Sequence, residues 1–207
     1  MEDHATEDID DVVYRRGTDI FFWTDVTQAS IIRLLEMLHE ATEEALLKQK
    51  KKVRRGLQFN PTVHLYIQSY GGDVFAGLSA MAHIRNNPVD VVTVADGMVA
   101  SAATLLLLGG SVRYILPYSH ILIHQLSAGF FGKHQDLLDE SKNASNIMQS
   151  LSEIYLTETR LGEKRIKKLL AKELDLTTEQ CIQFGVVKSI FPVPGRVLVS
   201  FAGSDAA

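Results

Sequence analysis

A segment of 13 residues in the middle of the chain constrains its fold more than any other: Gly97-Met-Val-Ala-Ser-Ala-Ala-Thr-Leu-Leu-Leu-Leu-Gly109. The β-branched run Val89–Ala95 before it predicts a buried strand, and the apolar run Ala102–Leu108 predicts the start of a buried helix. Ser101 therefore lies where a strand gives way to a helix, beside free N–H groups and the positive end of a helix dipole. A serine at such a junction serves either as a catalytic nucleophile or as the N-cap of a core helix.

Two further junctions favour the catalytic interpretation. An alternating strand, Val63–Ser69, runs through Gly71 and Gly72 into an amphipathic helix, and adjacent glycines allow backbone N–H groups to approach a neighbouring group closely. Downstream, an apolar strand ends in His124. The order of these parts along the chain is therefore oxyanion donors, a nucleophile at Ser101 and a base, which is typical of acyl transfer.

Three blocks of the sequence resemble the signature blocks of the ClpP family of serine peptidases: Ile67-Gln-Ser-Tyr-Gly-Gly-Asp-Val, Gly97-Met-Val-Ala-Ser-Ala-Ala-Thr-Leu-Leu and Leu116-Pro-Tyr-Ser-His-Ile-Leu-Ile-His-Gln. Two further stretches are similar to the family's handle-entry strand and to its closing helix and strand, respectively Gly129-Phe-Phe-Gly-Lys-His-Gln-Asp and Cys181-Ile-Gln-Phe-Gly-Val-Val-Lys-Ser-Ile. The resemblance spans about residues 18 to 192. It implies an α/β, ClpP/crotonase-like fold of repeated β-β-α units with a projecting handle helix.

The resemblance also implies roles for individual residues. Ser101 attacks the scissile carbonyl, and His124 takes its proton and later returns it to the leaving amine. The N–H groups of Gly72 and Ala102 form the oxyanion hole, where loss of one donor costs about 10²–10³ in kcat. Two neighbours of these positions are expected to bind substrate: Gly71 and Gln125.

The third member of the triad is open between two acidic residues. Counting without gaps forward from His124, or backward from Gly185, brings Glu173 to the family's aspartate position. Counting from Gly162 in the preceding turn brings Asp175 there instead. A third alternative is that the acid is displaced or absent.

Length and composition indicate one domain with a sizeable core, because 46% of the 207 residues are hydrophobic. We assign residues 19–192 to a ClpP-like peptidase domain, 1–18 to an acidic N-terminal segment and 193–207 to a C-terminal tail. The region of about 125–160 is expected to form the handle.

A basic stretch interrupts the first half of the predicted domain. A long helix is expected over 27–48, and the run Lys48–Arg55 that follows has six Lys or Arg residues in eight. We interpret about 48–61 largely as an insertion. It is either a solvated, mobile loop or a patch for an acidic partner.

Composition also excludes several classes of protein. A net charge of −4 argues against a dedicated nucleic-acid binder, and the sequence lacks an apolar run long enough to span a membrane. Cys181 is the only cysteine, which favours a reducing compartment, and with the lack of a signal-peptide pattern it predicts a cytoplasmic location. No HExxH, P-loop or GxGxxG motif occurs, so we expect no metal, nucleotide or other cofactor.

The partners expected for this chain follow from the resemblance. It implies self-association into stacked rings, two heptamers joined through the handle, that cleave unfolded proteins or peptides. The acidic segment 1–11 departs from the family and puts docking of an AAA+ unfoldase in doubt. Two other functions compete with the peptidase: a catalytically weak or inactive ring subunit, and a crotonase-like acyl-CoA enzyme.

Overall fold

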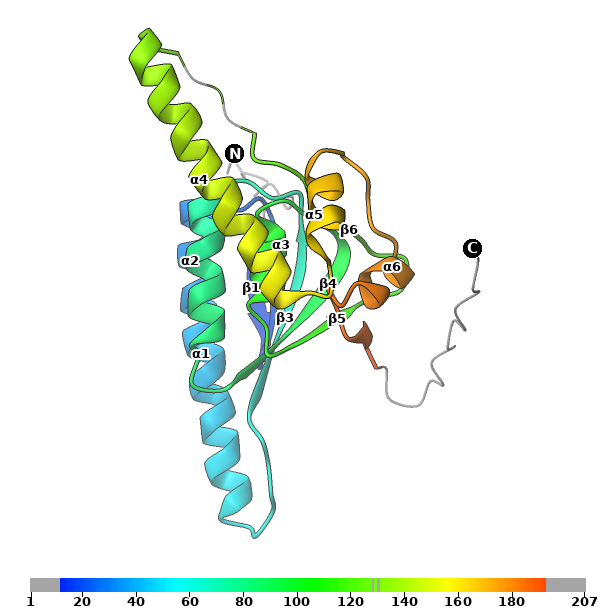
Figure 1. Cartoon of the computed structure of the whole chain (residues 1–207). Helices are drawn as coiled ribbons and strands as arrows, with labels where there is room; N and C mark the ends of the chain where they lie inside the picture. Colours follow the sequence, from blue (N-terminus) through cyan, green and yellow to red (C-terminus); the bar gives the residue numbers. More distant parts are fainter. Residues whose placement is uncertain (1–11, 128, 130, 193–207) are drawn as a thin grey trace, which may run out of the picture.

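The computed structural model of the chain describes residues 12–127, 129 and 131–192 (Figure 1). The strands of this part are β1 (Val12–Arg16), β2 (Asp19–Trp23), β3 (Thr62–Ser69), β4 (Asp90–Ala100), β5 (Val112–Ile115), β6 (His120–Leu122) and β7 (Ser189–Ile190). The helices are α1 (Gln28–Val53), α2 (Val74–Arg85), α3 (Ala103–Leu108), α4 (His134–Glu158), α5 (Glu163–Leu170) and α6 (Thr178–Gln183). None of the described helices is long and apolar enough to cross a membrane. The expected α/β class is confirmed.

The strands form one sheet in the order β1-β2-β3-β4-β5-β7, antiparallel between β1 and β2 and parallel elsewhere. The long central strand β4 changes partner along its length. Its first half pairs with β5, and its last residues, Met98–Ala100, pair with β6. The change occurs around Gly97, whose φ of +78° suits glycine and whose N–H donates to Ser119 Oγ at 2.9 Å. This split brings the end of β4 beside β6.

Helix α1 covers the first strands with an apolar stripe. Thr27 and Ser30 form a capping box at its start. Five of its buried positions recur at helical spacing, at Ile31, Leu34, Leu38, Ala41 and Ala45. The stripe packs against β1, β2 and β3 and fixes the edge of the sheet.

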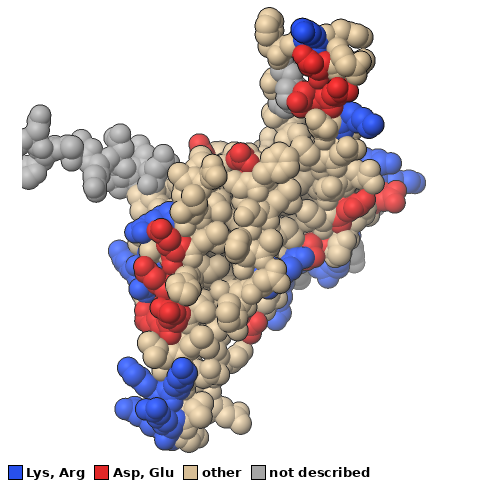
Figure 2. All heavy atoms as spheres, turned by 90° about the vertical axis from the view of Figure 1, so that its left-hand side faces the viewer, with Lys and Arg blue, Asp and Glu red and all other residues tan. Residues whose placement is uncertain are grey.

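The basic insertion is helical in its first part, so the loop interpretation is wrong for residues 48–53. Helix α1 continues to Val53 because Lys and Gln favour helix and because no glycine occurs between Gln28 and Gly56. Lys50, Lys51 and Lys52 in the last turn also complement the negative end of the helix dipole. Figure 2 shows Lys and Arg side chains gathered at this end of the molecule, where they are exposed to solvent.

Two strand assignments also need correction. The predicted N-terminal segment 1–18 includes strand β1, which pairs with β2 through a turn at Gly17, where φ is +62°. Tyr14 and Phe21 stack across this pair with ring centroids 4.7 Å apart. The strand expected over Gly129–Asp136 does not occur in the described residues of that stretch, where α4 already begins at His134.

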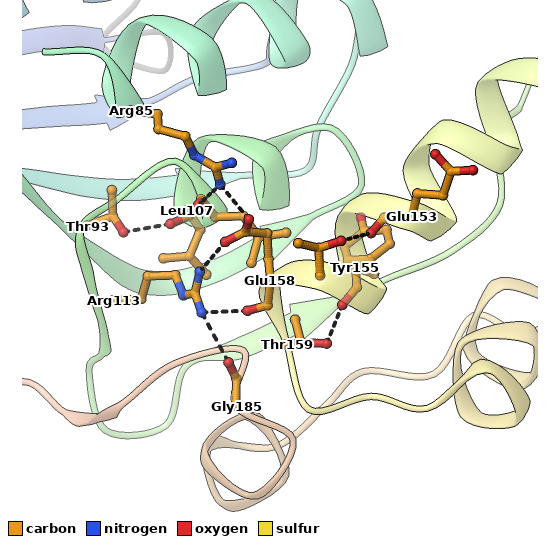
Figure 3. Close-up of polar contacts among 11 residues, drawn as sticks. Arg85, Thr93, Leu107, Arg113, Glu153, Tyr155, Glu158, Thr159 and Gly185 are labelled. Atoms are coloured by element: carbon orange, nitrogen blue, oxygen red, sulfur yellow. Dashed lines mark hydrogen bonds and ion pairs between the residues drawn. The ribbon is translucent and has the colours of Figure 1, made fainter.

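Helix α4 projects from the body of the domain as the expected handle (Figure 1). Its base is anchored through Glu158, whose carboxylate pairs with Arg85 at 3.0 Å and with Arg113 at 3.3 Å (Figure 3). Arg113 also donates to the Glu158 carbonyl at 2.6 Å and to the Gly185 carbonyl at 3.3 Å. The last turn of α4 is therefore tied to β5, to α2 and to the turn after α6.

Candidate active site

The junction between β4 and α3 holds Ser101 in a rare backbone conformation. Its φ is +53°, in the left-handed region, which costs a non-glycine residue roughly 1–3 kcal/mol. The Ser101 N–H donates to the Leu122 carbonyl at 2.9 Å, so it continues the pairing of β4 with β6. Strained backbone of this kind is concentrated at functional sites.

The glycine pair lies directly against this serine. A Cβ at Gly71 would approach Ser101 Cβ at 2.6 Å, and a Cβ at Gly72 would collide with the Val26 carbonyl. Both glycines have positive φ, +103° and +140°. Val26 holds the loop by accepting from Asp73 N–H and by donating to the Gly71 carbonyl, both at 2.7 Å. Only glycine fits both positions.

Two backbone N–H groups remain available at this junction. Among the described residues, neither the Gly72 N–H nor the Ala102 N–H has a hydrogen-bond acceptor. Both residues line one cavity of about 240 Å³ together with Ser101. Ala102 is buried whereas Gly72 is exposed, and two free donors on residues that line one cavity are suited to bind a carbonyl oxygen or an oxyanion.

The same cavity includes most of the residues predicted for the site. His124 and Gln125 line it, and Gly71 lies beneath Ser101. Its other walls are largely apolar and come from Tyr70, Val74, Leu105, Leu126, Ser127, Leu151 and Tyr155. The cavity can therefore hold an apolar side chain next to the serine hydroxyl.

His124 lies beyond the end of β6, not within a strand as predicted. The backbone just after it is held by a hydrogen bond from Gln125 N–H to the Leu170 carbonyl at 3.1 Å, which ties this segment to α5. Within the described residues, the Ser101 hydroxyl makes no hydrogen bond to His124 or to another group. The two side chains share the cavity without being bonded to each other.

Of the two candidate acids, Glu173 is the one next to the histidine. Its Oε1 lies 3.7 Å from His124 Nδ1, and its side chain is 81% exposed. Asp175 has no ion pair or hydrogen bond with His124 in the described chain. Its neighbour Leu176 is buried and pairs with Ile121 through backbone hydrogen bonds.

Sequence analysis missed two residues beneath the serine, Thr104 and Tyr155. Thr104 Oγ1 donates to the Ser101 carbonyl at 2.6 Å and lies 2.6 Å from the Tyr155 hydroxyl. Burial raises the pKa of Tyr155 to about 12. The signal for Thr104 was available, because it is the one polar residue in the run Ala102–Leu108.

Other reactive groups of the described chain lie outside this cavity. Cys181 is buried in α6, and burial raises the pKa of its thiol to about 12, so it is a poor nucleophile. No group of three or more His, Cys, Asp or Glu residues within the described ranges could hold a metal ion.

Comparison with known proteins relates the chain to one family and to a curated relative. The model of the Clp protease family matches residues 19–193. An ATP-dependent Clp protease proteolytic subunit of Deinococcus radiodurans is 31% identical to this chain over 130 residues. The aligned part is 62% of this chain and 64% of that protein, so the chain spans less than two thirds of the relative's length.

Proposed function

The chain belongs to the Clp protease family, and from this premise we propose that it is a serine endopeptidase with Ser101 as its nucleophile. One observation carries the proposal. A serine with φ of +53° faces a cavity that also contains two unpaired N–H donors, Gly72 and Ala102, and an imidazole, His124. An N-cap serine on a core helix needs none of these additional parts.

The proposed mechanism uses the cavity as follows. His124 accepts the proton of the Ser101 hydroxyl as the oxygen attacks the scissile carbonyl. The N–H groups of Gly72 and Ala102 bind the oxyanion that forms on the carbonyl oxygen. The protonated imidazole then donates to the leaving amine. Water, deprotonated by His124, hydrolyses the acyl-enzyme ester and releases the second product.

Glu173 is proposed to orient the imidazole through Nδ1. Its carboxylate lies on the correct side of the ring, at 3.7 Å, which is longer than a hydrogen bond. In free enzymes catalytic hydrogen bonds are often long and tighten only when substrate is bound. Gly71 and Gln125 are proposed to contact the peptide beside the nucleophile.

Self-association is part of the proposal. Leu137 and Leu138 lie in the projecting half of α4, and each is more than 40% exposed. Exposed apolar side chains on a projecting helix favour a second copy as the partner. We propose stacked rings of this chain, two heptamers, that enclose the cavities and admit unfolded proteins or peptides.

A second candidate function is a catalytically weak or inactive ring subunit of the same family. Two observations favour it: the Glu173 side chain is mostly exposed, and His124 makes no hydrogen bond to Ser101 in the described chain. The crotonase-like alternative has no comparable support, because none of the observations at the cavity points to an acyl-CoA ligand.

Labelling of the purified protein with a fluorophosphonate, followed by intact mass and native mass, tests the proposal. We expect one label for each chain, in a ring-sized species, and no label in Ser101→Ala. Absence of label from a well-formed ring contradicts the peptidase and supports the inactive subunit. Retention of label in Ser101→Ala excludes this serine as the nucleophile.

A further inference from the structure

Three hydroxyl and carbonyl groups form a continuous chain beneath the proposed nucleophile. The Tyr155 hydroxyl, Thr104 Oγ1 and the Ser101 carbonyl oxygen lie in sequence, with 2.6 Å between neighbours. Thr104 is fully buried and Tyr155 is 3% exposed. Water therefore does not compete for these hydrogen bonds, which strengthens them.

The donor and acceptor in each of these hydrogen bonds follow from the number of hydroxyl hydrogens available. Thr104 has one hydroxyl hydrogen, and the Ser101 carbonyl can only accept. If Thr104 donates to that carbonyl, its own oxygen must accept from Tyr155. Burial raises the pKa of Tyr155 to about 12, so the phenol keeps its proton at neutral pH and can donate. The order is thus Tyr155 to Thr104 to Ser101.

The Ser101 carbonyl belongs to the same peptide unit as the Ala102 N–H. A trans peptide is planar, and its C=O and N–H point in opposite directions. Two donors of Thr104 fix the carbonyl end, its N–H at 3.0 Å and its hydroxyl at 2.6 Å. The orientation of the Ala102 N–H, which lines the cavity, is then fixed as well.

We infer that Thr104 and Tyr155 are positioning residues, whose two hydroxyls hold the Ser101–Ala102 peptide so that the Ala102 N–H serves as an oxyanion donor. This inference rests on the proposed function. It also links the site to the handle, since Tyr155 lies on α4. Figure 3 shows Tyr155 in the last turn of α4, next to the Glu158 cluster that anchors this helix to the domain.

The chain offers a matched control for a buried threonine hydroxyl. Thr93 Oγ1 donates to the Leu107 carbonyl at 2.7 Å, and Thr93 is as deeply buried as Thr104. Leu107 lies in α3, six residues after Ser101, and is not among the residues that line the cavity. Figure 3 shows its carbonyl accepting from Thr93. Thr104→Val and Thr93→Val each remove one buried hydrogen bond from a hydroxyl to a backbone carbonyl, but only the carbonyl of Ser101 shares a peptide unit with the proposed oxyanion donor.

The test measures kcat and KM on a short peptide, and the rate of fluorophosphonate labelling, for assembled protein. We expect Thr104→Val to lower kcat roughly tenfold to a hundredfold with little change in KM, because the contact acts in the transition state. Tyr155→Phe, which removes one oxygen, is expected to lower kcat roughly threefold to tenfold. Thr104→Ser should restore most of the activity, and Thr93→Val should leave kcat within about twofold.

Several results would overturn the inference. Equal losses of kcat in Thr104→Val and Thr93→Val would mean a general loss of packing. Unchanged kcat in both Thr104→Val and Tyr155→Phe would mean that the peptide holds its orientation unaided. If Thr104→Val does not assemble, Tyr155→Phe alone decides the matter. An inactive, unlabelled parent protein would instead contradict the proposed function, and the inference with it.

Discussion

The nucleophile side of the proposed site is held by backbone hydrogen bonds and close packing, whereas the acids of its other side lie on an exposed loop. We use nucleophile side for Gly71, Gly72, Ser101, Ala102 and Thr104, and acid side for His124, Glu173 and Asp175. On the first, the Ser101 N–H and carbonyl both have partners within 3.0 Å. On the second, the shortest approach is the 3.7 Å between His124 Nδ1 and Glu173 Oε1.

The difference reflects which parts of the fold build each side. The nucleophile side is formed where β4 and β3 end at the middle of the sheet, so neighbouring backbone fixes it. On the acid side, His124 follows β6, and the two acids lie between α5 and α6, where one short bridge, Ile121 to Leu176, ties their segment to β6. A single folded chain is therefore enough to organise the proposed nucleophile and the two proposed oxyanion donors. We infer that the acid side depends on substrate or a neighbouring subunit to tighten.

The largest effect is expected from Gly71→Ala, which tests how rigid the nucleophile side is. The new Cβ would lie 2.6 Å from Ser101 Cβ, at a φ of +103° that alanine rarely adopts. We expect labelling by fluorophosphonate to slow about 10²–10³-fold, as when an oxyanion donor is lost. We also expect the free energy of unfolding to fall by about 2–4 kcal/mol.

Gly129→Ala is the control for this substitution, because a Cβ at Gly129 meets nothing within 4 Å. It should change neither the labelling rate nor the urea midpoint measurably. A Gly71→Ala protein that labels at the parent rate would show that the junction yields easily, and the contrast between the two sides would disappear.

A smaller effect is expected on the acid side. Glu173→Gln keeps the shape of the side chain and removes its charge. Because the carboxylate is 81% exposed and 3.7 Å from the imidazole, we expect kcat to fall about tenfold. Asp175→Asn, a matched change two residues away, should stay within about twofold. Peptide hydrolysis by assembled protein measures both.

The size of the loss of kcat in Glu173→Gln can contradict the contrast drawn between the nucleophile side and the acid side. A loss near 10⁴-fold is typical of a buried triad acid and would mean that the acid side is as tightly built in solution as the nucleophile side. A larger loss in Asp175→Asn than in Glu173→Gln would assign the triad to Asp175.

The elements around Ser101 could be predicted from the sequence because their patterns lie within a few neighbouring residues. The strand before Ser101, the glycine pair and the helix of buried leucines follow from apolar periodicity and from turn chemistry. Contacts between distant segments have no such signal. Tyr155 and Thr104 are 51 residues apart, so no local pattern in the sequence connects them.

The acid side was ambiguous for the same physical reason. The segment from Ala171 to Thr177 has no helical or alternating pattern that fixes its register, so two ways of counting gave Glu173 and Asp175. In the structure Glu173 is the acid that approaches His124, with Oε1 3.7 Å from Nδ1. The helical extension over 48–53 was missed because charge density was given more weight than helix propensity.

The smallest effect near pH 7 is expected from the burial of Tyr155, which lies beneath the nucleophile side. This effect on the free energy of unfolding becomes measurable at alkaline pH. The pKa of Tyr155 is raised from its ordinary 10 to about 12, mainly by burial. Between these values the unfolded chain loses a proton that the folded chain keeps, so the free energy of unfolding falls as pH rises. At about 1.4 kcal/mol for each pH unit, this loss approaches 3 kcal/mol by pH 12.

Urea unfolding at several pH values isolates this contribution by difference. The free energy of unfolding of Tyr155→Phe should fall less steeply with rising pH than that of the parent protein. Burial also raises the pKa of Cys181, but its contribution is the same in both proteins and cancels in the difference. Tyr118→Phe is the matched control, since it removes the hydroxyl of a tyrosine that is almost fully exposed. If Tyr155→Phe follows the parent, Tyr155 ionises as readily in the folded protein as in the unfolded chain. The interior beneath Ser101 would then be as open to water as the loop of Glu173, and both sides of the site would need assembly or substrate to become ordered.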